Sequence, residues 1–264
     1  MAGPDEGSLI TGGHKIKKEL TGPGFSFPAR CDTMEITSGR EAAAVKTCFI
    51  FCAGDCGGLL QAPAPGDCVL AADGGLRHLA RLGLRPTGIL GDFDSLGYVP
   101  EGARVFPVEK DDTDSMLAAR LGLEMGLRRF LFYGAMDGPR LDHTIANFQT
   151  LQFLADRGAV GYLVGKSDLA TVIRNERLEF PPSAKGILSL FCLGPDARGV
   201  TLEGLKYPLS DGCLTSGYPL GVSNHFTGQP ARITVRDGSL LALWNRDSGL
   251  PTRQPLPEPS HPAK

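Results

Sequence analysis

The sequence has no apolar run long enough to cross a bilayer. Such a span needs roughly 18 residues, and the best candidate, residues 48–60, is interrupted by Asp55 and three glycines. The N-terminus has no apolar signal-peptide core. Seven cysteines are an odd number, and no two form a Cys-x-x-Cys pair, so neither a disulfide framework nor a zinc site is indicated. We therefore expect no membrane partner and a reduced, cytoplasmic compartment.

An excess of charge of one sign is also lacking. The 27 Lys and Arg residues against 29 Asp and Glu residues leave a net charge of −2, which gives no electrostatic reason to expect a nucleic-acid partner. Collagen-like bias, coiled-coil bias and internal repeats are absent. With 42% apolar and 21% charged residues, the 264-residue chain is typical of a globular protein of one or two domains.

Composition divides the chain into four regions. Residues 1–45 hold few large apolar side chains and no sustained periodicity, which predicts a flexible extension. Residues 248–264 contain five prolines and are predicted to form a Pro-rich tail outside the fold. Between them the pattern changes near residue 168. We therefore expect two domains, residues 46–167 and 168–247.

Short apolar runs alternate with amphipathic stretches in the first of these domains. The runs suit buried strands, and the stretches suit helices that end at glycine. This alternation predicts an α/β domain built from right-handed βαβ units, with a mostly parallel sheet and flanking helices. The expected strands are residues 48–53, 68–72, 88–90, 104–108, 129–133 and 160–164. The expected helices are residues 75–82, residues 112–125 and a longer one that ends at Gly158.

The second domain has no helical periodicity. Its apolar runs are short and are separated by Gly, Pro, Asp and Ser, which predicts a small all-β, sandwich-like domain. The expected strands are residues 170–173, 187–192, 199–202, 231–235 and 240–244.

Aspartates follow the predicted strands of the first domain where each strand ends. Ligands of doubly wound sheets collect at this edge, so we expect the carboxylates to lie there together. Such acids repel one another unless cations neutralise them, and oxygen ligands suit Mg²⁺ that bridges phosphate oxygens. In an extended Asp92-x-Asp94 both side chains could reach one ion. The segments are Asp73-Gly74-Gly75, Gly91-Asp92-Phe93-Asp94-Ser95, Asp111-Asp112-Thr113-Asp114 and Leu141-Asp142-His143.

Each segment alone is a weak indication, because most aspartates are solvated surface or turn residues. Asp112 also fits a helix N-cap, and Asp114 fits a first-turn position that the helix dipole favours. Asp73 before two glycines also fits an ordinary turn. Their joint placement is what favours a site.

Two other patterns predict no site. Residues 161–167 resemble a Walker A loop, but the spacing is one residue short and the spacer is an apolar strand. The five histidines are scattered along the sequence, and only His143 lies near the carboxylates. We assign no metal role to it.

The aspartate segments form part of a longer ordered set. This set resembles the thiamine pyrophosphokinase (thiamine diphosphokinase) family over about residues 48–244. The resemblance implies transfer of the pyrophosphoryl group of ATP to the hydroxyethyl oxygen of thiamine, giving thiamine diphosphate and AMP. The remaining members of the set are residues 141–147, Gly204-Leu205-Lys206-Tyr207 and Gly221-Val222-Ser223-Asn224.

The resemblance also implies roles for individual residues. The catalytic and Mg²⁺-binding residues are expected to be Asp92, Asp94, Asp114 and Asp142. The residues expected to bind the ATP co-substrate are Asp73, Gly74, Gly75, Asp111 and Thr113. The residues expected to contact thiamine are Tyr207, Ser223 and Asn224. Thiamine is implied to bind between the catalytic domain of one subunit and the β domain of a partner, which makes the protein a homodimer.

Other readings of the carboxylates remain open. A metal-dependent glycosyltransferase would use Asp92 and Asp94 but would not explain Asp114 and Asp142. A haloacid-type phosphatase fits poorly, since Leu96 occupies the last position of its motif. A pyrophosphokinase acting on a hydroxymethylpterin would share the chemistry, and a non-enzymatic sensor would bind the same ligands without turnover.

Overall fold

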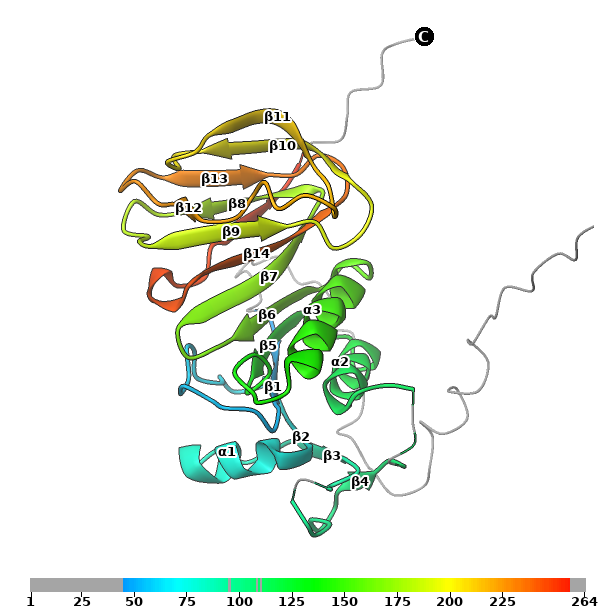
Figure 1. Ribbon diagram of the computed structural model, residues 1–264. Helices are drawn as coiled ribbons and strands as arrows, with labels where there is room; N and C mark the ends of the chain where they lie inside the picture. The colour runs from blue at the N-terminus through cyan, green and yellow to red at the C-terminus, as the bar shows by residue number, and fades with distance from the viewer. Residues whose placement is uncertain (1–44, 95, 108, 110, 257–264) are drawn as a thin grey trace, which may run out of the picture. The chain divides into compact units, whose positions relative to one another are not determined.

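The computed structural model (Figure 1) describes residues 45–94, 96–107, 109 and 111–256. All described residues belong to one compact unit, Ala44–Lys264. The flexible extension predicted for residues 1–45 lies outside the described residues except for Val45. Within the described part, no helix is both long and apolar enough to cross a membrane.

The first half of the described chain forms the parallel part of a ten-stranded sheet. Its strands are β1 (Thr47–Phe51), β2 (Cys68–Ala72), β3 (Gly88–Gly91), β4 (Arg104–Val105), β5 (Arg129–Tyr133) and β6 (Val160–Val164). They lie in the order β6-β5-β1-β2-β3-β4, and every neighbouring pair is parallel. All five residues of β1 are buried, as expected for a strand covered on both faces. The predicted mostly parallel sheet is confirmed.

Helices cover both faces of this parallel part. α2 (Asp114–Glu124) and α3 (Leu141–Ala155) pack on the face that carries Ile50, and α1 (Leu76–Leu82) packs on the face that carries Phe49. Neighbouring residues of a strand point to opposite faces, so one apolar strand serves both layers. The three predicted helices are confirmed, with ends that differ by a few residues.

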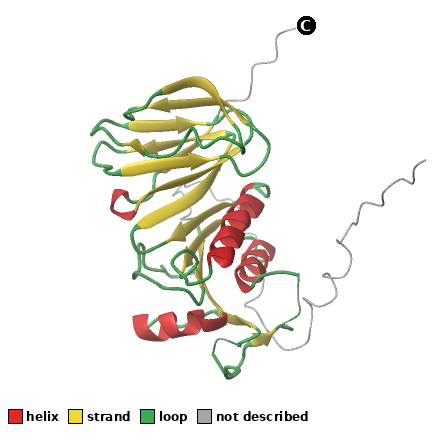
Figure 2. Ribbon diagram, viewed as in Figure 1, coloured by secondary structure: helices red, strands yellow, loops and turns green. Residues whose placement is uncertain are grey.

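Beyond α3 the described residues form strands, loops and one short 3-10 turn, Arg246–Ser248 (Figure 2). The strands that extend the first sheet are β7 (Asp168–Arg174), β14 (Ser239–Asn245), β9 (Ile187–Phe191) and β12 (Asn224–His225). The second sheet, in spatial order, contains β11 (Leu209–Leu214), β10 (Ala197–Glu203), β13 (Ala231–Thr234), β8 (Glu176–Phe180) and β15 (Thr252–Pro255). The two sheets share one apolar core, which confirms the predicted sandwich-like β region.

The first sheet continues across the change of sequence pattern near residue 168. β7 pairs antiparallel with β6 and follows it after a short turn. The chain therefore passes from the parallel half to the antiparallel half without leaving the sheet. The division into domains 46–167 and 168–247 stays a prediction.

The prediction of a tail over residues 248–264 is wrong for its first part. β15 pairs with β8 at the edge of the second sheet, where a proline is tolerated because no further strand needs its missing N–H. β8, β11 and β12 were also not predicted from the sequence. Charged or polar residues interrupt the apolar alternation in all three.

Candidate active site

A cavity of about 530 Å³ lies at the carboxyl ends of the parallel strands. Its lining comes from the segments after β1, β2, β3 and β5, from α1, and from the N-terminal turns of α2 and α3. This is the edge at which the sequence predicts the acids to gather, and doubly wound sheets bind ligands there. The predicted site residues in the lining are Asp73, Asp92, Asp94, Thr113 and Asp114.

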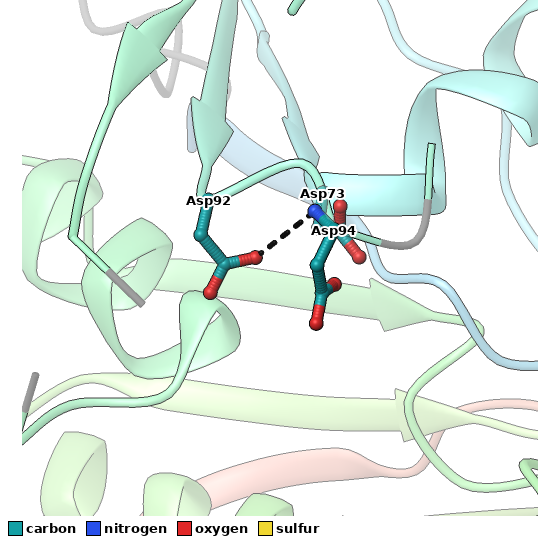
Figure 3. A group of neighbouring side chains, drawn as sticks. All are labelled: Asp73, Asp92 and Asp94. Carbon is teal, nitrogen blue, oxygen red and sulfur yellow. Dashed lines mark hydrogen bonds between the residues drawn. The ribbon is translucent and has the colours of Figure 1, made fainter. Parts of the chain in front are cut away.

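Three carboxylates lie close together in this cavity (Figure 3). Asp73, Asp92 and Asp94 each offer one oxygen to a group whose members all lie within 4.8 Å of one another. Asp73 is buried and Asp94 is exposed, with Asp92 between these limits. The group therefore extends from the base of the cavity to solvent.

A turn, not an extended strand, brings Asp92 and Asp94 together. The backbone N–H of Asp94 donates to Oδ1 of Asp92 at 3.3 Å, and Phe93 between them has φ +62° and a buried side chain. The expected extended geometry is wrong here, because Phe93 adopts a left-handed conformation between the two acids. Gly91 has φ +147°, and a Cβ there would lie 3.0 Å from the backbone N of Asp73. A glycine is therefore needed for the close approach of the β3 end to Asp73.

Asp114 enters the cavity from the first turn of α2. The N-cap of this helix is Thr113, whose Oγ1 accepts from the backbone N–H of Met116 at 3.2 Å. Asp112, which also fitted the N-cap from sequence, instead pairs with Arg120 at 2.9 Å. The first-turn position predicted for Asp114 is confirmed, and the helix dipole favours its negative charge there.

Asp142 lies at the first turn of α3 but does not line the cavity. Its side chain is 64% exposed and pairs with Arg140 at 2.6 Å. The hydrogen bond from Arg140 lowers the pKa of the Asp142 carboxyl. Arg140 and the exposed His143 do line the cavity. The metal role of Asp142 stays a prediction.

Of the five residues implied for ATP, Asp73 and Thr113 line the cavity, and Gly74, Gly75 and Asp111 do not. Asp111 is exposed. Gly74 and Gly75 are buried in the 3-10 turn after β2, and a Cβ at Gly75 would lie 1.8 Å from the carbonyl oxygen of Phe51. Gly75 thus allows close packing of this turn against the end of β1, which in turn positions Asp73.

The cavity holds two groups that the sequence analysis does not single out. Arg77, from the first turn of α1, brings a cation to the acidic wall. Burial, and then the charges of Asp114 and Asp73, raise the pKa of the Cys52 thiol to about 12. Neither Arg77 nor Cys52 belongs to a motif whose spacing could have revealed it.

The residues implied for thiamine lie in the antiparallel half and do not line the cavity. Tyr207 is 56% exposed. Asn224 is buried, and its Oδ1 accepts from the backbone N–H groups of Tyr207 and His225, both at 2.9 Å. Its Nδ2 donates to the Tyr207 carbonyl at 2.7 Å, so three of the four hydrogen-bonding positions of the carboxamide are used. Ser223 is exposed, with φ +62°. The thiamine roles stay predictions.

The Walker-like segment forms no phosphate loop. Its spacer, residues 162–164, lies within strand β6, and Lys166, which follows the strand, pairs through Nζ with Asp55. The backbone N–H of Lys166 donates to Asp137 at 2.6 Å. This lysine therefore ties the loops after β1, β5 and β6 together.

The acidic group fits a magnesium ion. Among the described residues, no hydrogen bond reaches Oδ1 of Asp73 although this oxygen is buried, and an uncompensated buried carboxylate oxygen is costly. A cation bound by Asp73, Asp92 and Asp94 would compensate it. The donors are all carboxylate oxygens, the ligand type that Mg²⁺ prefers.

Two family models match the chain, one in each half. The model described as "Thiamin pyrophosphokinase, catalytic domain" matches residues 64–160, which include the clustered acids. The model described as "Thiamin pyrophosphokinase, vitamin B1 binding domain" matches residues 175–240, which include Tyr207 and Asn224. The chain belongs to the thiamin pyrophosphokinase family. The resemblance noted in the sequence is confirmed.

Thiamin pyrophosphokinases of known sequence and structure resemble the chain over most of its described length. The thiamine pyrophosphokinase of Bacillus subtilis (strain 168) is 27% identical, with 67% of this chain and 87% of the relative covered. The crystal structure of the Geobacillus thermodenitrificans enzyme is 26% identical, with a TM-score of 0.64, and the match covers 77% of this chain and 99% of that one. A Bacillus subtilis crystal structure at 24% identity has a TM-score of 0.65, which shows the shared fold. Neither the matched models nor these relatives support a glycosyltransferase, a phosphatase or a pterin pyrophosphokinase.

Proposed function

We propose that this thiamin pyrophosphokinase transfers the pyrophosphoryl group of ATP to the hydroxyethyl oxygen of thiamine. The observation that carries the proposal is the grouping of Asp73, Asp92 and Asp94 in a cavity within the part matched by the catalytic-domain model. The thiamine oxygen bonds to the β-phosphorus, the bond from the β-phosphorus to the oxygen of the α-phosphate breaks, and AMP leaves. The hydroxyl proton passes to a carboxylate of the cavity.

The acidic wall would hold Mg²⁺ through Asp73, Asp92 and Asp94, with Asp114 facing the same space. When bound, the ion neutralises negative charge that develops on the phosphates during transfer. Arg77 and Arg140 bring guanidinium groups to the same cavity. Guanidinium groups pair well with phosphate oxygens, so we assign them to the triphosphate of ATP.

We further propose that the active enzyme is a homodimer with a shared thiamine site. The lining of the catalytic cavity ends at Asn147, and nothing from the vitamin B1 binding half of the described chain reaches it. Tyr207 and Ser223 could contact thiamine in the cavity of a partner subunit. The exposed apolar side chains beside them, Tyr218, Leu220 and Val222, suit burial against another chain.

The proposed reaction is tested by incubating the purified full chain with ATP, Mg²⁺ and thiamine. We expect equimolar AMP and thiamine diphosphate, and no product when EDTA replaces Mg²⁺. Hydroxymethylpterin and a panel of sugar nucleotides serve as alternative substrates in parallel reactions. Absence of thiamine diphosphate, or preferential use of the pterin, would refute the proposed function.

The shared site is tested by subunit mixing. Asp92→Asn removes an acid of the catalytic cavity, and Asn224→Ala alters the vitamin B1 binding half. If each site combines both halves from different subunits, mixing the two variants regenerates some intact sites and restores part of the activity. No recovery, under conditions where subunit exchange is demonstrated with labelled chains, would contradict a shared site.

We propose a cytoplasmic location as well. It rests on cysteine chemistry, since the six cysteines of the described residues are all free, as is usual in a reducing compartment.

A further inference from the structure

A chain of buried polar side chains lies along the base of the cavity. Ser115 follows Asp114 in the first turn of α2, and its Oγ donates to Oδ1 of Asn147 on α3 at 2.5 Å. Nδ2 of Asn147 donates to the carbonyl oxygen of Ala135, in the loop after β5, at 2.6 Å. The side chains of Ser115 and Asn147 are only 7% and 6% exposed. Three segments of the cavity wall are thus connected by two hydrogen bonds.

The hydrogen bonds between these polar side chains all run in one direction, from Thr113 to Ser115 to Asn147 to Ala135. A serine hydroxyl has a single proton, which Ser115 gives to Asn147. The Oγ of Thr113, 3.0 Å from that of Ser115, must then be the donor in their contact. Thr113 is also the N-cap of α2. The polar chain therefore fixes both neighbours of Asp114, one on each side.

Different interactions hold the body and the first turn of α2. Toward its middle, Ala118 and Ala119 are fully buried, and a Cβ at Gly122 would lie 2.5 Å from the Phe130 ring. Close apolar packing thus fixes the body of the helix on the sheet. At the first turn, the Ser115–Asn147 hydrogen bond ties α2 to α3. This turn carries Asp114 into the cavity.

We propose that Ser115 and Asn147 are positioning residues for pyrophosphoryl transfer, which fix the Asp114 carboxylate relative to the loop after β5. The inference rests on the proposed function. Neither side chain needs to touch a reacting atom, since each hydrogen bond described is internal to the protein. Placement errors of about 1 Å in an active site can cost roughly a hundredfold in rate, so the loss of this contact should be visible in turnover.

The test compares Asn147→Leu and Ser115→Ala with Thr150→Val. Asn147→Leu keeps similar volume and removes the bonds to Ser115 and Ala135. Ser115→Ala removes the bond to Asn147 and the one accepted from Thr113, with little change of shape. Thr150 lies on the same helix, is 1% exposed, and donates only to the Ala146 carbonyl at 3.1 Å, away from the cavity lining. It is the matched control for loss of a buried hydrogen bond. Urea unfolding of each variant gives the folded fraction under assay conditions.

For Asn147→Leu and Ser115→Ala we expect kcat to fall about tenfold to a hundredfold, with the thiamine KM within about twofold of wild type. The Mg²⁺ concentration for half-maximal activity should rise severalfold, because Asp114 is displaced. The double variant should lose less than the product of the single losses, since both changes break one contact. Thr150→Val should keep kcat and the Mg²⁺ dependence.

Two results separate this inference from the function on which it rests. If the wild-type chain forms no AMP, the proposed function fails. If the wild type is active and folded Ser115→Ala and Asn147→Leu match Thr150→Val in kcat and Mg²⁺ dependence, the positioning role fails alone. The positioning role also fails if the fall in kcat disappears after correction for the folded fraction. If Asn147→Leu does not fold, the kcat and Mg²⁺ dependence of the milder Ser115→Ala variant decide whether the positioning role holds.

Discussion

Replacing Arg253 by leucine should strongly destabilise the fold without affecting the chemistry. Arg253 lies on β15, and its side chain is 14% exposed. Its guanidinium pairs with Glu176, which is 17% exposed, and donates to Thr171 Oγ1 at 2.9 Å and the Val172 carbonyl at 2.6 Å. The substitution therefore leaves a largely buried carboxylate without its cation and two buried oxygens without this donor.

The magnitude follows from these contacts. Removing one partner of a buried ion pair costs about 3–5 kcal/mol. Glu176 keeps a bond from the backbone N–H of Arg174 at 3.3 Å and some solvent contact, so we expect about 2–4 kcal/mol. At typical urea m-values this lowers the midpoint of unfolding by about 1–2 M. The double variant Arg253→Leu/Glu176→Leu should recover more than half of the loss, because apolar side chains can replace such a pair at little cost.

Urea unfolding followed by tryptophan fluorescence measures this effect. Trp244 is the only tryptophan of the chain, is 1% exposed, and packs against Phe180 with ring centroids 5.4 Å apart. Gln254→Leu, at the exposed neighbouring position of β15, is the control and should shift stability by less than about 0.5 kcal/mol. A midpoint for Arg253→Leu equal to that of the control would refute the reasoning, as would a lower kcat in the fully folded variant.

Three further outcomes are expected. Asp92→Asn should lower kcat by about a hundredfold or more with an unchanged circular dichroism spectrum, and near-normal turnover at saturating Mg²⁺ would argue against a metal role. Asn224→Ala should raise the thiamine KM about tenfold and leave that for ATP unchanged, because the loop carrying Tyr207 loses its support; equal effects on both substrates would contradict this. Because burial raises the pKa of Cys52 to about 12, its thiol stays protonated at pH 8.5, and peptide mapping should show iodoacetamide labelling far slower than at the exposed Cys213. Equal labelling rates in the folded protein would refute the raised pKa.

Local patterns were enough to predict most of the fold. Continuous apolar runs such as Phe49 and its neighbours predict strands covered on both faces, and glycine-terminated amphipathic stretches predict the helices, since these signals depend only on nearby residues. β15 escaped prediction because its stability comes from Arg253 reaching Glu176, 77 residues earlier in the chain. A proline-rich segment gives no local sign of such a partner.

The candidate site was likewise predicted only in part from the sequence. Because strand ends can be read from the sequence and the carboxyl ends of parallel strands share one edge, the sequence alone placed Asp73, Asp92 and Asp94 together. Only the tertiary structure decided that a left-handed turn joins the last two acids and that Asp142 lies outside the cavity. It also revealed the buried contact between Ser115 and Asn147. The Ser115–Asn147 contact joins residues 32 positions apart, and such a contact leaves no periodicity in either segment.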